Sequence, residues 1–395
     1  MSAFFDWADR AGAALEAAWA RADRDEERFP AIAAAILAAD PPDAVFDKTT
    51  FVIDQLDTSR PARRQLAPPG VFGQPSFTVF HGNGFVIDVY FWRNSLSGIH
   101  NHPFCGVFTV LDGWSVHAVY AIEEPTRVSP RVTLGTLRQS TLELVEPGEL
   151  RPFSLRGHPL IHALIHVPVG AVSMVVRTTR TVGYLRYFPP SLVIAHEEED
   201  ELVARRIELL ETLRHARDPA FPEHLGRFLD GAELASTFVV LTRLWGNCSP
   251  ADRAALMERV RARHGARADT LPDAMERSRR WVAGDALRES LDDPDDRFVA
   301  TVLMLAETRA AALSLLAARH PDPVARLHRF IDEVVAFGPD DPAAPILAHA
   351  IADGLHAHAA AARLVEAFGA DNVPSGQHDA IERHQRDSIF AALGR

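Results

Sequence analysis

Gly98-Ile-His-Asn-His-Pro-Phe-Cys-Gly106 runs directly into Val107-Phe-Thr-Val-Leu-Asp-Gly113 in this chain. The second part is a short run of β-branched and aromatic residues that ends in an Asp-Gly turn, which predicts a β-strand. His100 and His102 lie where this pattern begins, and residues i and i+2 of a strand project from the same face. Two such imidazoles can converge on one metal ion, because metal–nitrogen bonds in proteins are about 2 Å long.

Similar runs continue on both sides, from about residue 45 to residue 190. Gly and Pro clusters such as Pro68-Pro-Gly70 and Pro147-Gly148 separate them. Their period of two and their close spacing favour a sandwich or a small barrel over parallel βαβ units, and we expect an antiparallel barrel. The runs are Phe51-Val-Ile-Asp, Phe77-Thr-Val-Phe, Phe85 to Trp92, Val107 to Leu111, Ser115 to Tyr120, Arg131-Val-Thr-Leu, Ala163 to Val167 and Val172 to Arg177.

Helical patterns flank these strands. Apolar residues recur every three or four positions from Phe4 to Trp19, and a second helix is predicted from Pro30 to Pro41. After Pro190 the helical period returns, first in a helix lined by Leu202, Ile207, Leu210 and Leu213. Further helices are predicted over about 231–246, 250–264, 271–290, 295–319, 322–337, 342–369 and 378–393. The sequence therefore predicts an α+β protein with N-terminal helices over 1–43, a β-barrel over 44–192 and an α-helical domain over 193–395.

Composition narrows the function classes. The 395 residues carry a net charge of −12, which disfavours binding to nucleic acid or to an anionic membrane surface. Two cysteines cannot form a disulfide framework, and the first residues lack the pattern of a signal peptide, so we expect a cytoplasmic protein. The longest apolar run near the N-terminus, 31–39, is too short to span a bilayer. Phosphate-binding, dinucleotide-binding and nucleophile-elbow motifs are absent from the sequence.

A second histidine cluster lies sixty residues after the first, with members at His158, His162 and His166. In strand geometry His162 and His166 share a face with Leu164. Three or four histidines that point into one barrel would form an imidazole-only site, suited to Fe(II), Zn(II), Cu(II) or Ni(II), and Mn(II) is also considered. The sequence leaves open which of the three later histidines joins His100 and His102.

Other histidines lie in the predicted helical domain. His356 and His358 are two positions apart on a helix, so their side chains point in different directions and cannot share a metal. His349, Asp353 and His356 share a helix face, and an acid such as Glu307 could complete a site with them. We expect a solvated or hydrogen-bonded face at this position.

The histidine-bearing segments resemble the two sequence motifs of the cupin family, over roughly residues 75 to 180. Gly98 through Gly113 is similar to the first motif, in which His-x-His precedes a short strand and a glycine turn. Pro147-Gly-Glu-Leu-Arg151 through Val167 is similar to the second, which ends in the third ligand. The resemblance implies a cupin-type β-barrel that holds a metal with His100, His102 and His162.

Within that family the pattern resembles the three-histidine thiol dioxygenases, because no Glu follows the His-x-His pair. This resemblance implies Fe(II), molecular oxygen and a small polar or sulfur-containing substrate. Three neutral ligands would leave the charge of the ion available to an anionic substrate and leave coordination positions open. Two alternatives stay open: a non-catalytic metal- or ligand-binding protein whose helical domain binds a protein partner or a second copy, and a redox-free enzyme that uses Zn(II) or Mn(II).

Several other residues are candidates for the site. Arg93 and Arg177 could each bind a substrate carboxylate in a bidentate fork, or could be surface arginines at strand ends. His166 and His117 are predicted to contact the metal-ligating histidines without binding the metal themselves. Cys105 is expected to be a core residue without a cross-link. Tyrosine candidates for the barrel interior are Tyr90, Tyr120, Tyr184 and Tyr187, with Tyr120 and His117 on opposite faces of one strand.

Overall fold

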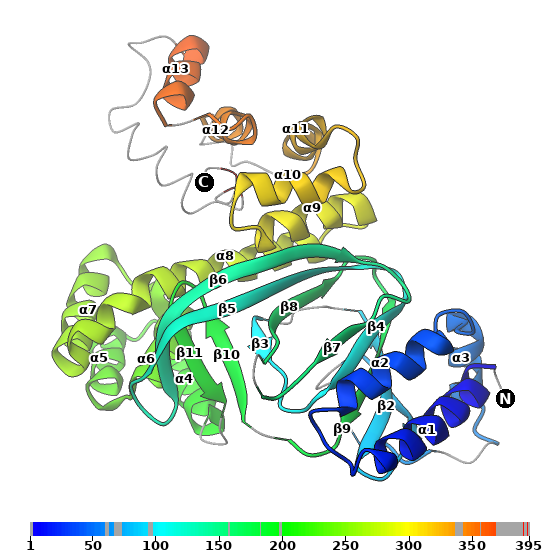
Figure 1. The fold of residues 1–395 in the computed structure, drawn as a ribbon. Helices are drawn as coiled ribbons and strands as arrows, with labels where there is room; N and C mark the ends of the chain where they lie inside the picture. The colour runs from blue at the N-terminus through cyan, green and yellow to red at the C-terminus, as the bar shows by residue number, and fades with distance from the viewer. Residues whose placement is uncertain are drawn as a thin grey trace.

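The structure is a computed structural model that describes residues 3–59, 63–66, 73–93, 98–156, 159–181, 183–196, 200–335, 343–355 and 357–368, together with Phe390 and Leu393. Within these residues it shows an α+β fold, in which antiparallel sheets lie between N-terminal and C-terminal helices (Figure 1). The predicted helix 378–393, apart from Phe390 and Leu393, and the residues His158 and His356 lie outside the described residues.

Three N-terminal helices cover the outer face of one sheet (Figure 1). The first two were predicted from sequence and are confirmed, with Trp7 and Phe29 buried in a core that they share with Phe85 and Ile87 of the sheet. The prediction of a strand at Phe51 was wrong, because this residue lies in a helix. The helices are α1 (Ala3–Arg21), α2 (Phe29–Ala39) and α3 (Lys48–Leu56).

The sequence of α3 explains why the strand prediction failed. Asp47 precedes the helix in an extended conformation, and its side chain accepts a hydrogen bond from the backbone N–H of Thr50. Such a cap satisfies an N–H group that a helix start leaves without an internal partner. Phe51 is buried against Phe4 and Phe5, so a single large side chain anchors the helix to the N-terminal core.

Two antiparallel sheets face each other. The first is five-stranded with the order β1-β2-β9-β4-β7, and the second closes as a barrel with the order β10-β11-β6-β5-β8-β3. Gly113 has a positive φ of 83° in the turn between β4 and β5, a conformation that glycine adopts without strain. The strands are β1 (Ser76–His81), β2 (Phe85–Trp92), β3 (His100–Asn101), β4 (Gly106–Asp112), β5 (Ser115–Arg127), β6 (Val132–Val145), β7 (Arg151–Phe153), β8 (Ile161–His166), β9 (Ala171–Thr178), β10 (Tyr184–Phe188) and β11 (Leu192–His196).

Apart from Phe51, each predicted run up to Arg177 overlaps a β-strand, whereas β7, β10 and β11 were not predicted. Pro189 and Pro190 were interpreted as the end of the strand region, but they lie in the turn between β10 and β11. Strand β11 pairs with β6, and β10 pairs with β3 through Arg186 and His100. These two pairings close the barrel next to the histidine pair.

The C-terminal region is helical, as predicted, but two long helices of the prediction are each divided in two. Ala306 and Glu307 separate α9 from α10, where Thr308 caps the second helix, and Asp353 to Leu355 lie between α12 and α13. The helix α5 was not predicted. The bounds are α4 (Asp200–His215), α5 (Phe221–Gly231), α6 (Leu234–Leu244), α7 (Pro250–His264), α8 (Leu271–Glu289), α9 (Pro294–Leu305), α10 (Arg309–Ala317), α11 (Pro323–Glu333), α12 (Ala343–Ala352) and α13 (Ala357–Phe368), with short 3-10 helices at Trp245–Asn247 and Gly265–Thr270.

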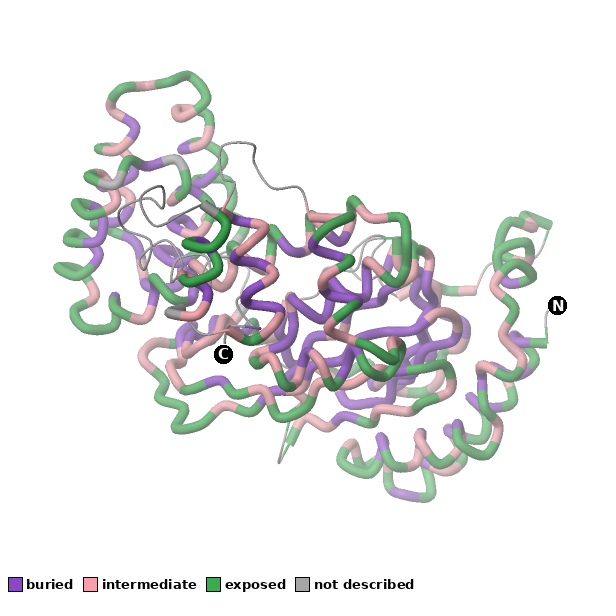
Figure 2. The backbone as a smooth tube through the Cα atoms, turned by 90° about the horizontal axis from the view of Figure 1, so that it is seen from above, coloured by how far each residue is buried: buried purple, intermediate pink, exposed green. Residues whose placement is uncertain are grey.

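The middle of this helical region shares a core with the barrel. Trp114 packs edge-to-face on Phe298 of α9, with ring centroids 5.1 Å apart. Val116 and Ile165 point from the outer face of the barrel into the same apolar cluster. Buried residues, drawn purple in Figure 2, occur both in the barrel strands and in these helices. The helices α8 to α10 therefore pack on the barrel wall, and α11 packs on α9 and α10.

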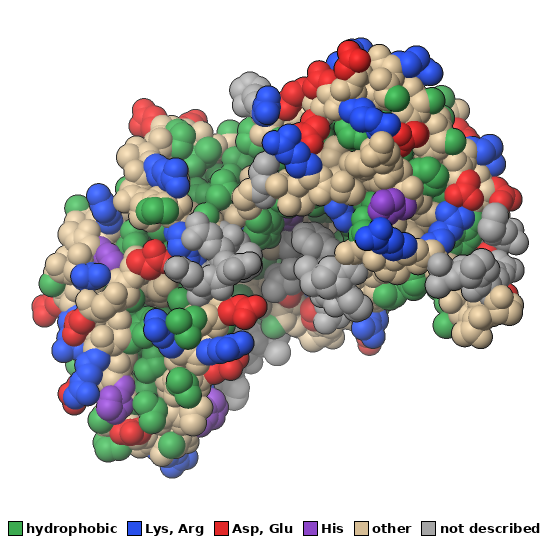
Figure 3. Space-filling view, turned by 90° about the horizontal axis from the view of Figure 1, so that it is seen from below, with side chains coloured by type: hydrophobic (Ala, Val, Ile, Leu, Met, Phe, Trp, Pro, Cys, Tyr) green, Lys and Arg blue, Asp and Glu red, His purple; other side chains and the backbone are tan. Residues whose placement is uncertain are grey.

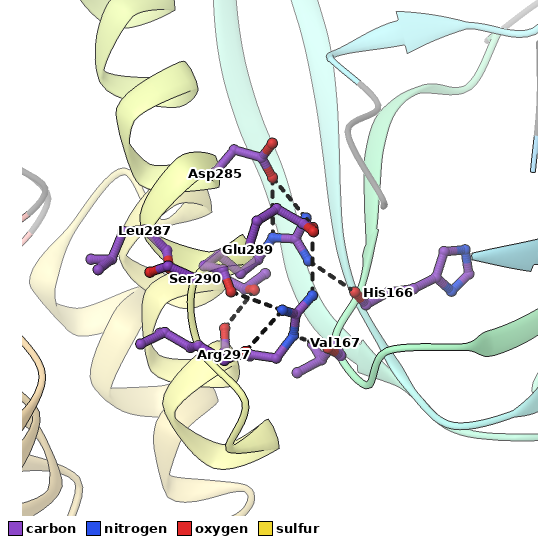
Figure 4. A network of polar contacts seen from close by, with 10 residues as sticks. His166, Val167, Asp285, Leu287, Glu289, Ser290 and Arg297 are labelled. Carbon is purple, nitrogen blue, oxygen red and sulfur yellow. Dashed lines mark hydrogen bonds and ion pairs between the residues drawn. The ribbon is translucent and has the colours of Figure 1, made fainter. Parts of the chain in front are cut away.

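Two buried arginines reinforce this junction (Figure 4). Arg297 donates from Nε to the carbonyl of Val167 at 2.7 Å and from Nη1 to the carbonyl of Arg288 at 2.8 Å. Arg288 itself donates to the carbonyl of His166 at 3.4 Å and forms ion pairs with Asp285 and Glu289. Both guanidinium groups are buried, and their charges are paired or hydrogen-bonded, as a buried charge requires.

No helix among the described residues combines the length and the hydrophobicity that a bilayer crossing requires. On the molecular face in Figure 3, basic and acidic side chains are interspersed.

Candidate metal centre

Three histidines converge inside the barrel, one from β3, one from the residue that follows β3 and one from β8. His100 of β3 lies directly opposite His162 of β8 in the ladder, and His102 follows two residues later on the same side as His100. The ring centroids of His100 and His162 are 4.8 Å apart, and those of His102 and His162 are 4.7 Å apart. One nitrogen of each ring lies within 4.8 Å of the others. The sequence prediction that these residues come together is confirmed.

A hydrogen bond at the outer nitrogen of His100 defines where this ring carries its proton. His100 Nδ1 is 2.8 Å from the carbonyl oxygen of Gly98, and because a carbonyl only accepts, this nitrogen carries the proton. The lone pair of a neutral His100 is then on Nε2. The Nε2 atoms of His102 and His162 are buried and have no hydrogen-bond partner among the described residues. Buried polar atoms of this kind need a ligand, and a metal ion fits that need.

The environment keeps these rings neutral. Burial lowers the pKa of His102 and His162 well below the ordinary 6.5, and the neighbouring histidines lower it further. Burial also lowers the pKa of His100. Neutral imidazole is the form that binds a metal, so the lone pairs are available at neutral pH.

Aromatic side chains surround the histidines. Phe153 of β7 stacks on His102 with ring centroids 4.2 Å apart, and Phe104 lies 5.3 Å from the same ring. Phe108 of β4 lies 5.7 Å from His162. These rings belong to an apolar cluster between the two sheets, so the site has a low-dielectric wall.

The donor set fits a transition metal. It contains three neutral imidazole nitrogens, and no carboxylate belongs to this group in the described part of the chain. Such sites suit iron, zinc, copper or nickel, and the donors do not distinguish between them. The structure therefore supports a three-histidine metal site.

The two predicted supporting histidines lie in different places. His117 of β5 touches the centre, because its Nε2 is 3.0 Å from His162 Nδ1. His166 is four residues beyond His162 on the same strand face, about 13 Å along the strand. It stacks on Trp92 at 4.6 Å, and its Nδ1 is 2.7 Å from Ser115 Oγ. The structure thus brings His117 to the three-histidine group and places His166 towards the other end of the barrel.

The two arginines that were predicted as candidates for binding a substrate carboxylate lie in different environments. Arg93 is exposed just after β2, and its role towards a substrate carboxylate stays a prediction. Arg177 points between the sheets and binds the buried Asp88, with Nε and Nη2 each 2.9 Å from Oδ2. Tyr90 and Thr78 also donate hydrogen bonds to Asp88. The Arg177 guanidinium therefore already has a carboxylate partner within the protein.

Among the remaining candidates, Tyr120 faces the helices, and its hydroxyl accepts a hydrogen bond from Gln139. It is thus on the face opposite to His117, as predicted. Tyr184 lies 5.8 Å from His100 between ring centroids. Cys105 is buried on the outer face of the sheet, next to Thr178 and the N-terminal helices, so its assignment as a core residue is confirmed.

The helical histidines form a separate hydrogen-bonded cluster. His349 Nε2 is 2.8 Å from Asp332, and its Nδ1 is 2.7 Å from Nδ1 of His328. His328 Nε2 is in turn 2.7 Å from Asp353. Glu307 instead forms an ion pair with Arg277. The four groups form a linear chain, which agrees with the predicted hydrogen-bonded face and does not converge on one point.

The sequence did not predict Glu143, which is hydrogen-bonded to His117, or Arg151, which is hydrogen-bonded to Glu143. They are 26 and 34 positions away from His117, and only the pairing register of the strands brings them to it. Phe153 was missed for the same reason.

No known family model matches this chain, and no curated protein is significantly similar to it.

Proposed function

We propose that this chain is a cupin-type metalloenzyme, a mononuclear non-haem Fe(II) oxygenase similar to the thiol dioxygenases. The observation that supports the proposal is the buried group of His100, His102 and His162, which supplies three neutral nitrogen donors and no carboxylate. A ferrous ion held in this way would keep most of its positive charge and would supply open positions for an anionic substrate and O₂. The substrate class that suits such a centre is a small polar or sulfur-containing molecule.

The chain's own residues would supply binding and orientation. His100 is held by the carbonyl of Gly98 and His162 by the side chain of His117, so two ligands have their outer nitrogen fixed. Such contacts orient a ligating ring and increase its basicity. Both histidines lie on paired strands, which hold a site more rigidly than loops do.

The aromatic wall would exclude water. Phe104, Phe108 and Phe153 occupy the space between the histidines and the five-stranded sheet. A dry site strengthens electrostatic interactions between a bound anion and a cationic centre. It would also protect a reactive centre from side reactions with solvent.

The first experiment is metal analysis of tag-free protein, beside His100→Ala/His102→Ala and the control His81→Ala/His215→Ala. The control removes two exposed histidines that lie outside the barrel interior. We expect near-stoichiometric iron in the parent and the control, and none in the site variant. Oxygen uptake by the iron-loaded parent with a panel of thiols and amino acids then tests the reaction.

The outcomes separate the alternatives. Turnover that persists without O₂, with zinc or manganese bound, would replace the oxygenase with redox-free chemistry. Stable metal binding without turnover, together with a partner or a second copy bound through the helical region, would indicate a binding protein. Absence of metal from the parent, even after reconstitution, would refute the metalloenzyme proposal altogether.

A further inference from the structure

A chain of polar side chains runs outward from the histidine group to the rim of the barrel. His162 Nδ1 is 3.0 Å from His117 Nε2, and His117 Nδ1 is 2.9 Å from Glu143 Oε1. Arg151 donates to both carboxylate oxygens of Glu143, from Nε at 2.9 Å and from Nη2 at 3.0 Å. We refer to Arg151, Glu143, His117 and His162 as the relay.

The relay connects the two sheets. His117 of β5 and Glu143 of β6 are directly paired in the ladder, so their side chains project from the same face. Arg151 comes from β7, at the end of the opposite sheet. His117 and His162 are about 1% and 2% exposed, whereas Glu143 and Arg151 reach the surface with 31% and 24% of their side chains exposed. A charged pair at the rim thus connects to two buried imidazoles inside the barrel.

The relay allows only one arrangement of protons when both rings are neutral. Its hydrogen bond to His117 and the contact with Arg151 lower the pKa of Glu143 to about 2, so this side chain is a carboxylate that only accepts. The nitrogen of His117 that faces it, Nδ1, must carry the proton, and Nε2 of His117 is then an acceptor. His162 must therefore donate from Nδ1.

The consequence lies at the metal-facing side of His162. With its proton on Nδ1, a neutral His162 has its lone pair on Nε2, the buried atom without a partner among the described residues. The other tautomer would place a hydrogen on Nε2, in the centre of the histidine group, and a lone pair on Nδ1 against that of His117 Nε2. A carboxylate that acts through one ring on another thus selects the form of His162 that can bind metal.

We propose that Glu143 is a positioning residue for the metal centre, which acts through His117 to hold His162 in its Nε2-binding tautomer and orientation. Arg151 holds the Glu143 carboxylate in place. The inference rests on the proposed metal site, but it concerns a property of the chain that is present before any metal binds.

The first test measures tautomers in the metal-free protein. Long-range ¹H–¹⁵N correlation spectra of histidine-labelled protein distinguish Nδ1–H from Nε2–H rings, and a His162→Gln variant assigns the signal. We expect His162 as the Nδ1–H form in the parent, and a mixture of both forms in Glu143→Gln. A parent in which His162 is already mixed, or a Glu143→Gln spectrum identical to the parent's, would overturn the proposal.

The second test measures affinity for Co(II) and Zn(II) by competition with a chelator. Loss of a residue that orients a metal ligand weakens binding by about 10- to 100-fold, and we expect Glu143→Gln to fall in this range. The matched control is Glu123→Gln, which removes an exposed carboxylate from the same β5–β6 strand pair, where it binds Arg138 at 2.7 Å. Circular dichroism and thermal unfolding check that all variants are folded.

A double-variant cycle shows whether Glu143 acts through His117. In a His117→Leu background, Glu143→Gln should change the metal affinity by less than 2-fold, because Glu143 no longer has a hydrogen-bonded path to His162. An equal loss in both backgrounds would mean a general charge effect and would overturn the proposal. If the parent binds metal with the expected relay effects but does not consume O₂, the oxygenase function fails and the relay stands. If Glu143→Gln binds metal as tightly as the parent does, and the parent consumes O₂, the relay proposal fails and the oxygenase function stands.

Discussion

His100 and His162 face each other directly across the β3–β8 ladder, although 62 positions separate them in the chain. Because paired residues on one face of a sheet have their Cβ atoms about 5 Å apart, this register alone brings the two rings to metal-binding distance. His102 joins them from the same strand side. The pairing identifies His162, rather than His166, as the third member of the group.

This assignment predicts a sharp difference between two variants of strand β8. His162→Ala should lose at least 10-fold in affinity for Zn(II), because one of three donors is gone. His166→Ala removes a ring of the same type, four residues away on the same face, and should keep the affinity of the parent within about 3-fold. Chelator competition measures both. Equal losses in the two variants would show that His166 belongs to the centre.

Arg297 ties the helical region to the barrel and should be essential for stability. Its side chain is 2% exposed and donates to the carbonyls of Val167, Arg288 and Leu291. Arg297→Met would remove a donor from each of these three carbonyls, of which that of Val167 is buried, and we expect a loss of about 3–5 kcal/mol in the free energy of unfolding. Urea denaturation measures it. The control Arg205→Met changes an arginine of α4 that is 75% exposed, and should cost little.

A loss below about 1 kcal/mol for Arg297→Met would contradict this prediction. It would mean that water reaches the three carbonyls once the guanidinium is gone, and that the junction between α9 and β8 is looser than the hydrogen bonds indicate.

Removing the charge of Asp88 alone should destabilise the protein more than removing both charges of its ion pair with Arg177. The carboxylate is 1% exposed and binds Arg177, Thr78 and Tyr90 between the two sheets. Asp88→Asn leaves the guanidinium without its counter-charge, at a cost of about 3–5 kcal/mol. Asp88→Asn/Arg177→Met removes both charges and should therefore be less destabilised than Asp88→Asn alone. If the free energy of unfolding of the double variant falls by the sum of two large effects, the ion pair contributes net stability, which would contradict this prediction.

Much of the fold was predictable because the local signals were strong. Apolar residues three or four positions apart between Phe4 and Trp19 predicted α1, and the Asp112-Gly113 turn predicted the end of β4, where the β4–β5 hairpin turns. The convergence of His100 and His102 was predictable because i and i+2 share a strand face, whereas His162 as the third member was implied only by the family resemblance. Phe51 failed because a short apolar run does not distinguish a helix from a strand, and the Asp47 cap was the better signal.

Other features depend on information that a single sequence does not carry. The pairing of His117 with Glu143 depends on register, and the β5–β6 ladder contains two register shifts further along. The break between α9 and α10 at Ala306 and Glu307 has no Gly or Pro to mark it, and only the Thr308 cap signals it. The contact between Arg297 and Val167 joins segments 130 positions apart.

His166 should make the stability of the metal-free protein depend on pH. Burial lowers its pKa from the ordinary 6.5 to about 3, and the nearby Arg288 contributes to the shift. Between these two values the unfolded chain binds a proton at this site and the folded chain does not. Acidification therefore favours the unfolded state, and the contribution of His166 to stability falls as the pH is lowered from about 6.5 towards 3.

The measurement compares the free energy of unfolding of the parent and of His166→Gln from pH 8 down to about pH 4. Glutamine does not titrate and retains a group that can bond with Ser115, so the difference between the two curves isolates the imidazole. We expect a constant difference above pH 6.5 and a relative loss in the parent of up to about 1.4 kcal/mol per pH unit below it. Parallel curves over the whole range would show that His166 accepts a proton in the folded barrel as readily as in the unfolded chain, in conflict with its burial against Trp92.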